Sequence, residues 1–260
     1  MSASIGDGVS LQIRGSVATI VFDQNRTRNA MQLGTWLGIP ALIAAAEENA
    51  SVGLIVLRGA HGNFGTGNDI SEFGALHGDS AAARCFGTAM ADAMQAVEVA
   101  SKPVLVAIEG LCYGGSVALA LAGDLRIAAS NATFAITPAK LGAVYLQSDL
   151  HRLVAAVGLG QSKKLIYSAH PISAARAEEI GLVDGVISSD DFEVGLELLM
   201  GAILRGSPFT LRRTKEMLRM VAPTPKETEE TLGIFVEATQ GDDFVEGVNA
   251  FLAKRLPKFR

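Results

Sequence analysis

Residues 102–128 read KPVLVAIEGLCYGGSVALALAGDLRIA, and this run indicates the fold class of the 260-residue chain. A short apolar run after Pro103 is typical of a buried strand, and a glycine-rich loop at 110–115 follows it directly. Residues 116–122 then have the spacing of a helix, and a further apolar strand is predicted at 125–128. This order of elements favours an α/β fold in which parallel strands are buried between helices.

The same alternation of short apolar strands and helices extends along the chain in both directions. A β-hairpin is predicted over residues 9–22, because apolar residues alternate on either side of a turn at 14–16. Further strands are predicted at 53–57, 103–108, 125–128, 133–136 and 182–187. Helices are predicted at 31–48, 80–100, 116–122, 149–157, 161–169, 174–180, 192–204, 208–221, 226–240 and 243–256.

Prolines mark the expected interruptions of this pattern. Pro40 is expected to kink or restart the first helix, since it lacks the N–H that a helix interior needs. The second half of the chain is mostly helical, and Pro223 and Pro225 mark the predicted boundary between the body and a C-terminal helical piece. We therefore expect a main body at residues 1–222 and a C-terminal helical region at residues 223–260.

The composition excludes several classes of protein. Apolar residues make up 49% and charged residues 19%, which excludes intrinsic disorder. The net charge of −5 argues against nucleic-acid binding, which needs a basic surface. Cys85 and Cys112 form no CxxC, and the four histidines lack ligand spacing, so neither a metal site nor a disulfide framework is expected. No apolar run approaches the roughly 18 residues of a membrane helix, and no secretory signal is present, so a cytoplasmic location is expected.

Two glycine-rich loops are the candidate sites for chemistry, because each follows a predicted buried strand. They read NFGTGNDI at 63–70 and EGLCYGGS at 109–116, and the second runs directly into a helix. Glycines let backbone N–H groups approach a ligand closely, and a helix N-terminus adds unsatisfied donors. Two such loops side by side could aim two N–H groups at one oxygen, as in an oxyanion hole. The alternative is that the glycines serve only tight turns and packing.

The motifs, taken in order, resemble those of the crotonase family, also called the enoyl-CoA hydratase/isomerase family. The resemblance extends from about residue 9 to residue 259. Its motifs, in one-letter amino-acid code, are the tripeptide RNA at 28–30, FGTGNDI at 64–70, KPV at 102–104, GG at 114–115, DLRIA at 124–128, PISA at 171–174, GLV at 181–183 and EGVNAFLAKR at 246–255.

This resemblance implies a crotonase-type ββα spiral with a C-terminal helical trimerisation region. It implies an acyl-CoA thioester substrate, whose oxygen lies between the backbone N–H groups of Asn68 and Gly115. Preorganised donors at that place would stabilise an enolate by several kcal/mol. Coenzyme A would be part of the substrate, so no separate cofactor is expected. The implied assembly is a homotrimer or a dimer of trimers, with no nucleic-acid or membrane partner.

The resemblance also implies a set of substrate-binding residues. Arg28 and Lys254 are expected to contact the phosphates of CoA. Lys254 would contact a CoA bound to its own or to a neighbouring subunit. The alternative for Lys254, given equal weight, is that it is an ordinary solvated charge on the surface. Asp69 is expected to fix its loop rather than to act as a base. The remaining residues lie in the motifs quoted above: Ala30, Gly67, Ile70 and Gly114.

The chain departs from the family at two catalytic positions. Many family hydratases use two glutamates as acid and base, and the matching positions here hold Ala118 and Pro138. Neither residue can transfer a proton. Residues 134–145, FAITPAKLGAVY, instead resemble FxMTPxxLGxPY of methylmalonyl-CoA decarboxylase-like members. In that branch the tyrosine that matches Tyr145 lies near the carboxylate that is lost; an ordinary aromatic of the pocket wall is the alternative.

The predicted function is therefore an acyl-CoA enzyme that acts through an enolate stabilised by an oxyanion hole. Loss of both glutamates favours decarboxylase-like or other lyase or isomerase chemistry, because such a reaction needs an enolate stabiliser but no strong base. Two alternatives stay open: an atypical enoyl-CoA hydratase, and an acyl-CoA binding protein without turnover. An activity that depends on Tyr145 would separate an enzyme from a binding protein.

Overall fold

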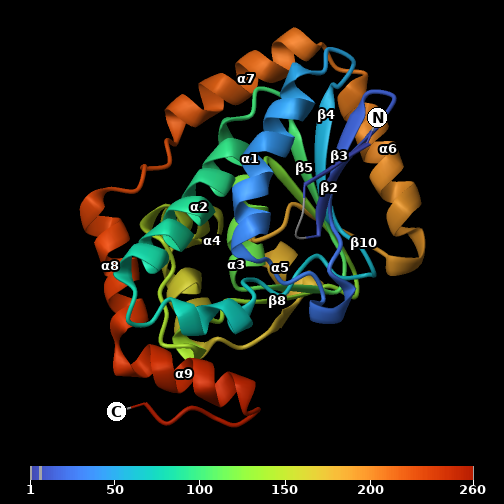
Figure 1. Ribbon diagram of the computed structural model, residues 1–260. Helices are drawn as coiled ribbons and strands as arrows, with labels where there is room; N and C mark the ends of the chain where they lie inside the picture. The colour runs from blue at the N-terminus through green and yellow to red at the C-terminus, as the bar shows by residue number, and fades with distance from the viewer. Residues whose placement is uncertain (1, 6–7, 260) are drawn as a thin grey trace.

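The centre of the molecule is a large twisted sheet with helices on both faces (Figure 1). The computed structural model describes residues 2–5 and 8–259. Residues 1, 6 and 7 lie outside the described residues. They belong to the N-terminal segment for which the sequence predicts no secretory signal. Among the described residues this sheet has seven strands, which are, in spatial order, β1 (Ser2–Ile5), β2 (Val9–Arg14), β3 (Val17–Phe22), β4 (Leu54–Gly59), β5 (Val104–Ile108), β7 (Leu125–Ala129) and β10 (Gly185–Ile187).

The pairing of these strands changes at β3. The strands β1, β2 and β3 pair antiparallel, so the predicted hairpin is confirmed. From β3 to β10 every neighbouring pair is parallel, as the short buried strands predict. Parallel neighbours need crossover connections, and helices supply most of them.

A second, smaller sheet gives the chain its spiral course. Among the described residues it holds β6 (Leu111–Tyr113), β8 (Thr133–Ala135) and β9 (Ile172–Ser173). One turn of the spiral is β5, then β6, then α3 (Gly115–Ala122); the next is β7, β8 and α4 (Gln147–Ser168). Each turn thus sends one strand to each sheet before its helix begins, which is the expected ββα arrangement.

The other helices follow the predicted ranges to within a few residues. The structure has α1 (Leu33–Glu48), α2 (Ser80–Val99), α5 (Ala174–Glu179), α6 (Phe192–Leu204), α7 (Pro208–Val221), α8 (Glu229–Gln240) and α9 (Asp242–Leu252). Short 3₁₀ helices are η1 (Asn25–Thr27), η2 (Ile70–Ala75), η3 (Pro138–Lys140) and η4 (Ser189–Asp191). No single helix of the described ranges is long and apolar enough to span a membrane. The segments 189–204 and 208–221 reach that length and apolar composition only when they are taken together, and they are bent relative to each other.

The core forms on both faces of the large sheet, because successive side chains of a strand point to opposite faces. In β4, Leu54 and Val56 pack toward α6, where Phe192 is buried against them. Ile55 and Leu57 belong to the larger core on the other face, where α1, α2 and α3 pack. Figure 1 shows α1 and α6 on opposite sides of the strands.

Three sequence predictions differ from the structure. Helix α1 continues through Pro40 rather than restarting there, and Trp36, one turn earlier, is fully buried in the core. The two helices predicted at 149–157 and 161–169 follow each other as one element, α4, with a non-helical backbone only at Gly158. The predicted loop at 110–115 contains the strand β6, which at three residues is too short for periodicity to reveal.

The C-terminal helices pack on the body of the same chain. Helix α8 lies along α2, and α9 lies below it against η2 (Figure 1). Close approach depends on Gly87 of α2, where an added Cβ would lie 2.9 Å from Phe235 Cδ1. The apolar side chains of this region were expected to be buried in the body or between subunits. Five are buried in the body, namely Leu232, Phe235, Val236, Phe244 and Val248, whereas Phe251 and Leu252 are 57% and 58% exposed.

Candidate active site

Backbone hydrogen bonds hold the two glycine-rich loops side by side. The Phe64 N–H donates to the Glu109 carbonyl at 2.8 Å, and the Gly65 N–H donates to the Leu111 carbonyl at 2.8 Å. The Tyr113 N–H returns to the Gly65 carbonyl at 3.0 Å. The loops therefore continue the parallel pairing of the strands that precede them, which brings their ends to one place.

Two glycines are required where the loops meet. Gly67 has φ +89°, and an added Cβ would lie 2.8 Å from the Tyr113 carbonyl oxygen and 3.0 Å from the Gly115 nitrogen. Gly114 has φ +53°, a left-handed backbone that side chains rarely adopt. The Ser116 hydroxyl accepts a hydrogen bond from the Gly67 N–H at 2.9 Å and so links the loops once more.

The N–H groups of Asn68 and Gly115 are the two candidate oxyanion donors. Within the described ranges neither N–H has a hydrogen-bond acceptor. Gly115 is the first residue of α3, where the helix dipole favours negative charge. An added Cβ at Gly115 would lie 3.0 Å from Asn68 Oδ1, so the two residues face each other. Both line the same cavity.

This acyl cavity, as we name it, is small and mostly apolar, with a volume of about 50 Å³. Tyr145 is the only ionisable side chain among the described residues that line it. Its wall is formed by Thr66, Asn68, Ile70, Phe73, Leu76, Met90, Gly114, Gly115, Thr137, Pro138, Leu141, Ala143, Val144, Tyr145, Phe235, Thr239 and Phe244. Two converging donors above such a wall can stabilise an oxyanion in a place of low polarity.

The Tyr145 hydroxyl donates to the Gly114 carbonyl at 2.6 Å. That carbonyl belongs to the peptide whose N–H is the Gly115 donor, and hydrogen bonds in series polarise one another. Burial raises the pKa of Tyr145 well above its usual value, and the charges of Asp149 and Cys112 raise it further. Tyr145 therefore stays protonated and holds the Gly114–Gly115 peptide in place.

The structure separates the other predicted site residues into two groups. Ile70 lines the acyl cavity, and Ala30 is buried near the loop, with the next residue, Met31, bonded to the Gly67 carbonyl. Asp69 accepts from the Ser71 N–H at 3.0 Å and caps η2, so its carboxylate holds the start of that helix. Arg28 and Lys254 are exposed and lie outside the wall of the cavity.

The two positions that the resemblance of the motifs matches to family glutamates lie in different surroundings. Pro138 lines the acyl cavity. Ala118 is fully buried in the core on α3 and is not among the residues of the cavity wall.

Sequence reasoning missed several residues of the wall, because they come from segments far from the glycine loops. Phe73 stacks on Phe244 with ring centroids 5.4 Å apart, which brings η2 and α9 together over the cavity. Met90 comes from α2 and Phe235 from α8. Trp36 lies behind Asn68, and no periodic pattern distinguishes it from an ordinary core residue.

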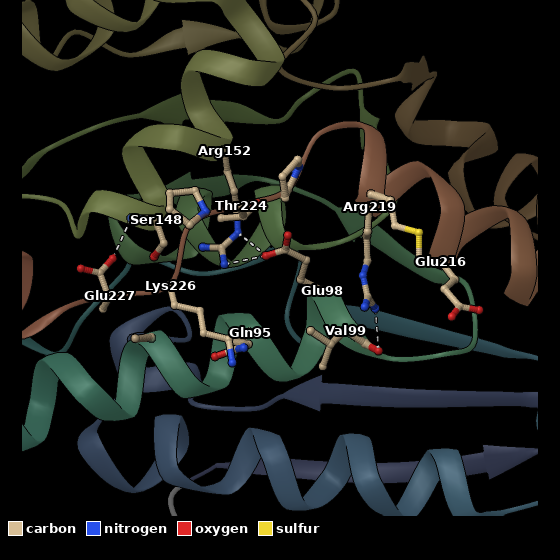
Figure 2. Close-up of a pocket in the computed structure, with 14 residues that line it drawn as sticks. Gln95, Glu98, Val99, Ser148, Arg152, Glu216, Arg219, Thr224, Lys226 and Glu227 are labelled. Atoms are coloured by element: carbon tan, nitrogen blue, oxygen red, sulfur yellow. Dashed lines mark hydrogen bonds and ion pairs between the residues drawn. The ribbon is translucent and has the colours of Figure 1, made fainter.

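A second cavity of about 350 Å³ lies beside the start of α4 and is lined by charged groups (Figure 2). Figure 2 shows Arg152 pointing to Glu98, to which it donates at 2.7 and 2.9 Å. Arg152 also donates to the buried Asp149 at 3.0 Å. The Ser148 N–H donates to Glu227 at 2.7 Å. Arg152 is thus paired with both Glu98 and Asp149 beside this polar cavity.

Asp149 is expected to make stability depend on pH. Burial raises its pKa from 3.8 to about 7, against the opposing charge of Arg152. The folded protein then binds the proton more tightly than the unfolded chain, so the free energy of unfolding falls as pH rises from about 4 to about 7. Asp149→Asn cannot ionise and should remove this part of the slope. Urea unfolding at several pH values measures how the free energy of unfolding depends on pH. Asp243→Asn, at an exposed position, serves as control. An equal dependence on pH in wild type and Asp149→Asn would contradict the prediction.

The ββα fold and its two adjoining glycine loops are features of one family of enzymes. Residues 12–260 match the enoyl-CoA hydratase/isomerase family, and the chain belongs to this family of enzymes. It is 30% identical to methylmalonyl-CoA decarboxylase of Escherichia coli (strain K12), over 94% of each chain. It is 29% identical to crotonyl-CoA hydratase of Syntrophomonas wolfei, over 97% of this chain and 98% of that one.

Solved structures agree on the fold. The crystal structure of an enoyl-CoA hydratase/isomerase family protein from Hyphomonas neptunium is 38% identical, with a TM-score of 0.81 over 99% of each chain. The crotonase-type ββα fold predicted from the motifs is therefore confirmed. The relatives include both a decarboxylase and hydratases, so the family membership alone leaves the reaction open.

Proposed function

We propose that this enzyme decarboxylates a short carboxyacyl-CoA thioester through an enolate held by the N–H groups of Asn68 and Gly115. One observation carries the proposal. The acyl cavity has two backbone donors, but no carboxylate, histidine or lysine among its described lining residues. Water addition needs a base and an acid, each worth roughly 10² to 10⁴ in rate, whereas loss of carbon dioxide needs neither at its first step.

The reaction balances without a cofactor. The bond between the α-carbon and the carboxylate breaks, and its electron pair moves into the thioester as an enolate. Carbon dioxide leaves, and a proton from water then binds the α-carbon to give the shortened acyl-CoA. Coenzyme A is part of the substrate. The apolar walls favour the step, because a localised carboxylate loses more solvation there than a delocalised enolate bonded to two donors.

The size of the acyl cavity supports a short acyl group. Its volume of about 50 Å³ is far below the roughly 300 Å³ at which drug-sized ligand pockets begin. Phe73, Phe235 and Phe244 form part of its wall. For the nucleotide part, we keep Arg28 and Lys254 as proposed phosphate contacts, since both are exposed.

The products of the reaction test the proposal. The enzyme is incubated with malonyl-, methylmalonyl- and crotonyl-CoA, and product masses are measured by mass spectrometry. We expect loss of carbon dioxide from at least one of the first two. Gain of water by crotonyl-CoA alone would favour the second candidate, an atypical hydratase, to which the resemblance to the Syntrophomonas enzyme points. Unchanged masses throughout would contradict both.

We expect a homotrimer or a dimer of trimers in solution. Apolar side chains of α7 and α9 are more than half exposed in the single chain, and surfaces of this kind usually mark contacts between proteins. They include Met217, Leu218, Val221, Phe251 and Leu252. Light scattering at micromolar concentration tests the expectation, and a strict monomer would contradict it. The polar substitution Val221→Lys should weaken the assembly, while the substitution Glu237→Lys on α8 serves as control.

A further inference from the structure

Trp36 lies behind the two residues of the candidate oxyanion hole. It is the only tryptophan of the chain, and it is fully buried. Its indole Nε1 donates to Asn68 Oδ1 at 3.0 Å. Its Cζ2 atom lies 3.3 Å from the position of a Cβ added to Gly115. Helix α1, which carries Trp36, thus packs against both glycine loops at their meeting point.

The chemistry of the indole determines which way the Asn68 amide points. An indole N–H can only donate, so it must meet the amide oxygen and not the amide nitrogen. The amide nitrogen therefore points the other way, toward Met90 Sδ at 3.5 Å. A thioether is a weak acceptor, and an amide nitrogen has two N–H groups. Since Asn68 and Met90 both line the acyl cavity, the Asn68 amide can donate a further hydrogen bond to a group bound there.

We infer that Trp36 is a positioning residue that keeps the Asn68 amide donor toward the acyl cavity, where this donor binds the carboxylate of a carboxyacyl group. This inference rests on the proposed function. The backbone N–H of Asn68 is the proposed partner of the thioester oxygen, so its side chain lies beside the group on the α-carbon. Tyr145 does not supply this contact in the structure, because its single proton already bonds to the Gly114 carbonyl.

The inference is tested with two stable ligands that differ only in the carboxylate. They are the amide analogues of malonyl-CoA and propionyl-CoA, in which an NH replaces the thioester sulfur. Calorimetry gives their dissociation constants with the full-length protein. Wild type should prefer the malonyl analogue, and Trp36→Phe, which keeps an aromatic ring but removes the N–H, should reduce this preference about tenfold, as expected for a hydrogen bond to a charged group.

Tyr167→Phe is the matched control, because it also removes one polar hydrogen from an aromatic side chain, but Tyr167 is 74% exposed and lies outside the acyl cavity. Its preference for the malonyl analogue should stay within twofold of wild type. An unchanged preference in Trp36→Phe would overturn the inference, and so would an equal loss in Tyr167→Phe.

A second measurement uses the single indole N–H and is independent of whether Trp36→Phe folds. In ¹⁵N-labelled protein this group gives one tryptophan side-chain resonance. Asn68→Leu, which removes the acceptor, should move the indole proton upfield, and the malonyl analogue should shift it in wild type more than the propionyl analogue does. Equal shifts with both analogues, or no shift in Asn68→Leu, would overturn the inference.

The results separate the inference from the proposed function. Release of carbon dioxide by wild type together with an unchanged preference in Trp36→Phe would overturn the inference alone. A carboxylate preference that depends on Trp36, without any release of carbon dioxide, would support the inference and contradict the proposed reaction.

Discussion

Gly115→Pro is expected to abolish turnover while the fold is kept. Gly115 is the first residue of α3, a position where helices tolerate proline well. The substitution removes the N–H that we assign as the second oxyanion donor. Loss of one such donor costs roughly 10² to 10³ in kcat. Steady-state kinetics on the substrate found by product masses, with circular dichroism for the fold, measure the effect.

Gly115→Ala is the matched control for this experiment. Its added Cβ meets the same neighbours, Asn68 Oδ1 at 3.0 Å and Trp36 Cζ2 at 3.3 Å, but the N–H remains. We expect Gly115→Ala to lose much less activity than Gly115→Pro. Equal losses would mean that crowding, and not the missing donor, explains the result, and turnover of Gly115→Pro within threefold of wild type would show that the donor is misassigned.

The second large effect concerns hydration of crotonyl-CoA. Wild type should hydrate this substrate poorly, because Tyr145, the only ionisable side chain on the described cavity wall, already uses its proton. Pro138→Glu places a carboxylate on that wall and should raise hydration by about 10², the contribution of one acid–base group. Absorbance at the enoyl thioester band measures the rate. Wild-type turnover near roughly 10 s⁻¹ would contradict the prediction, since that is an ordinary enzyme rate.

Ala139→Glu controls for the added charge, because Ala139 is the next residue but is exposed and lies outside the acyl cavity. It should leave hydration at the wild-type level. The sequence alone would have placed the test at Ala118. In the structure that side chain has no exposed surface, so a glutamate there would be a buried charge without a partner and would lower stability.

Much of the fold was predictable, because its signals are local. The buried strands β4 and β5 are continuous apolar runs between turn residues, and this pattern identifies parallel strands covered on both faces. The paired loops were also predictable, since Gly67 and Gly114 need backbone angles that favour glycine. The strand β6 and the uninterrupted helix α1 were not, because tertiary pairing outweighed weak local signals.

The features of the candidate site also fall into two groups, those that the sequence predicts and those that only the structure shows. The sequence by itself determined the α/β class and the two glycine loops, because each depends on neighbours within a few residues. The assignment of Asn68 and Gly115 as donors came from the resemblance of the motifs to those of the family and stays a prediction. Only the tertiary structure decided that Tyr145 bonds to the Gly114 carbonyl and that Trp36 donates to Asn68 Oδ1, which lies 32 residues away in the chain. Such contacts depend on how α1 and the loop before α4 pack against the two glycine loops, and packing between distant segments leaves no periodic trace in the sequence.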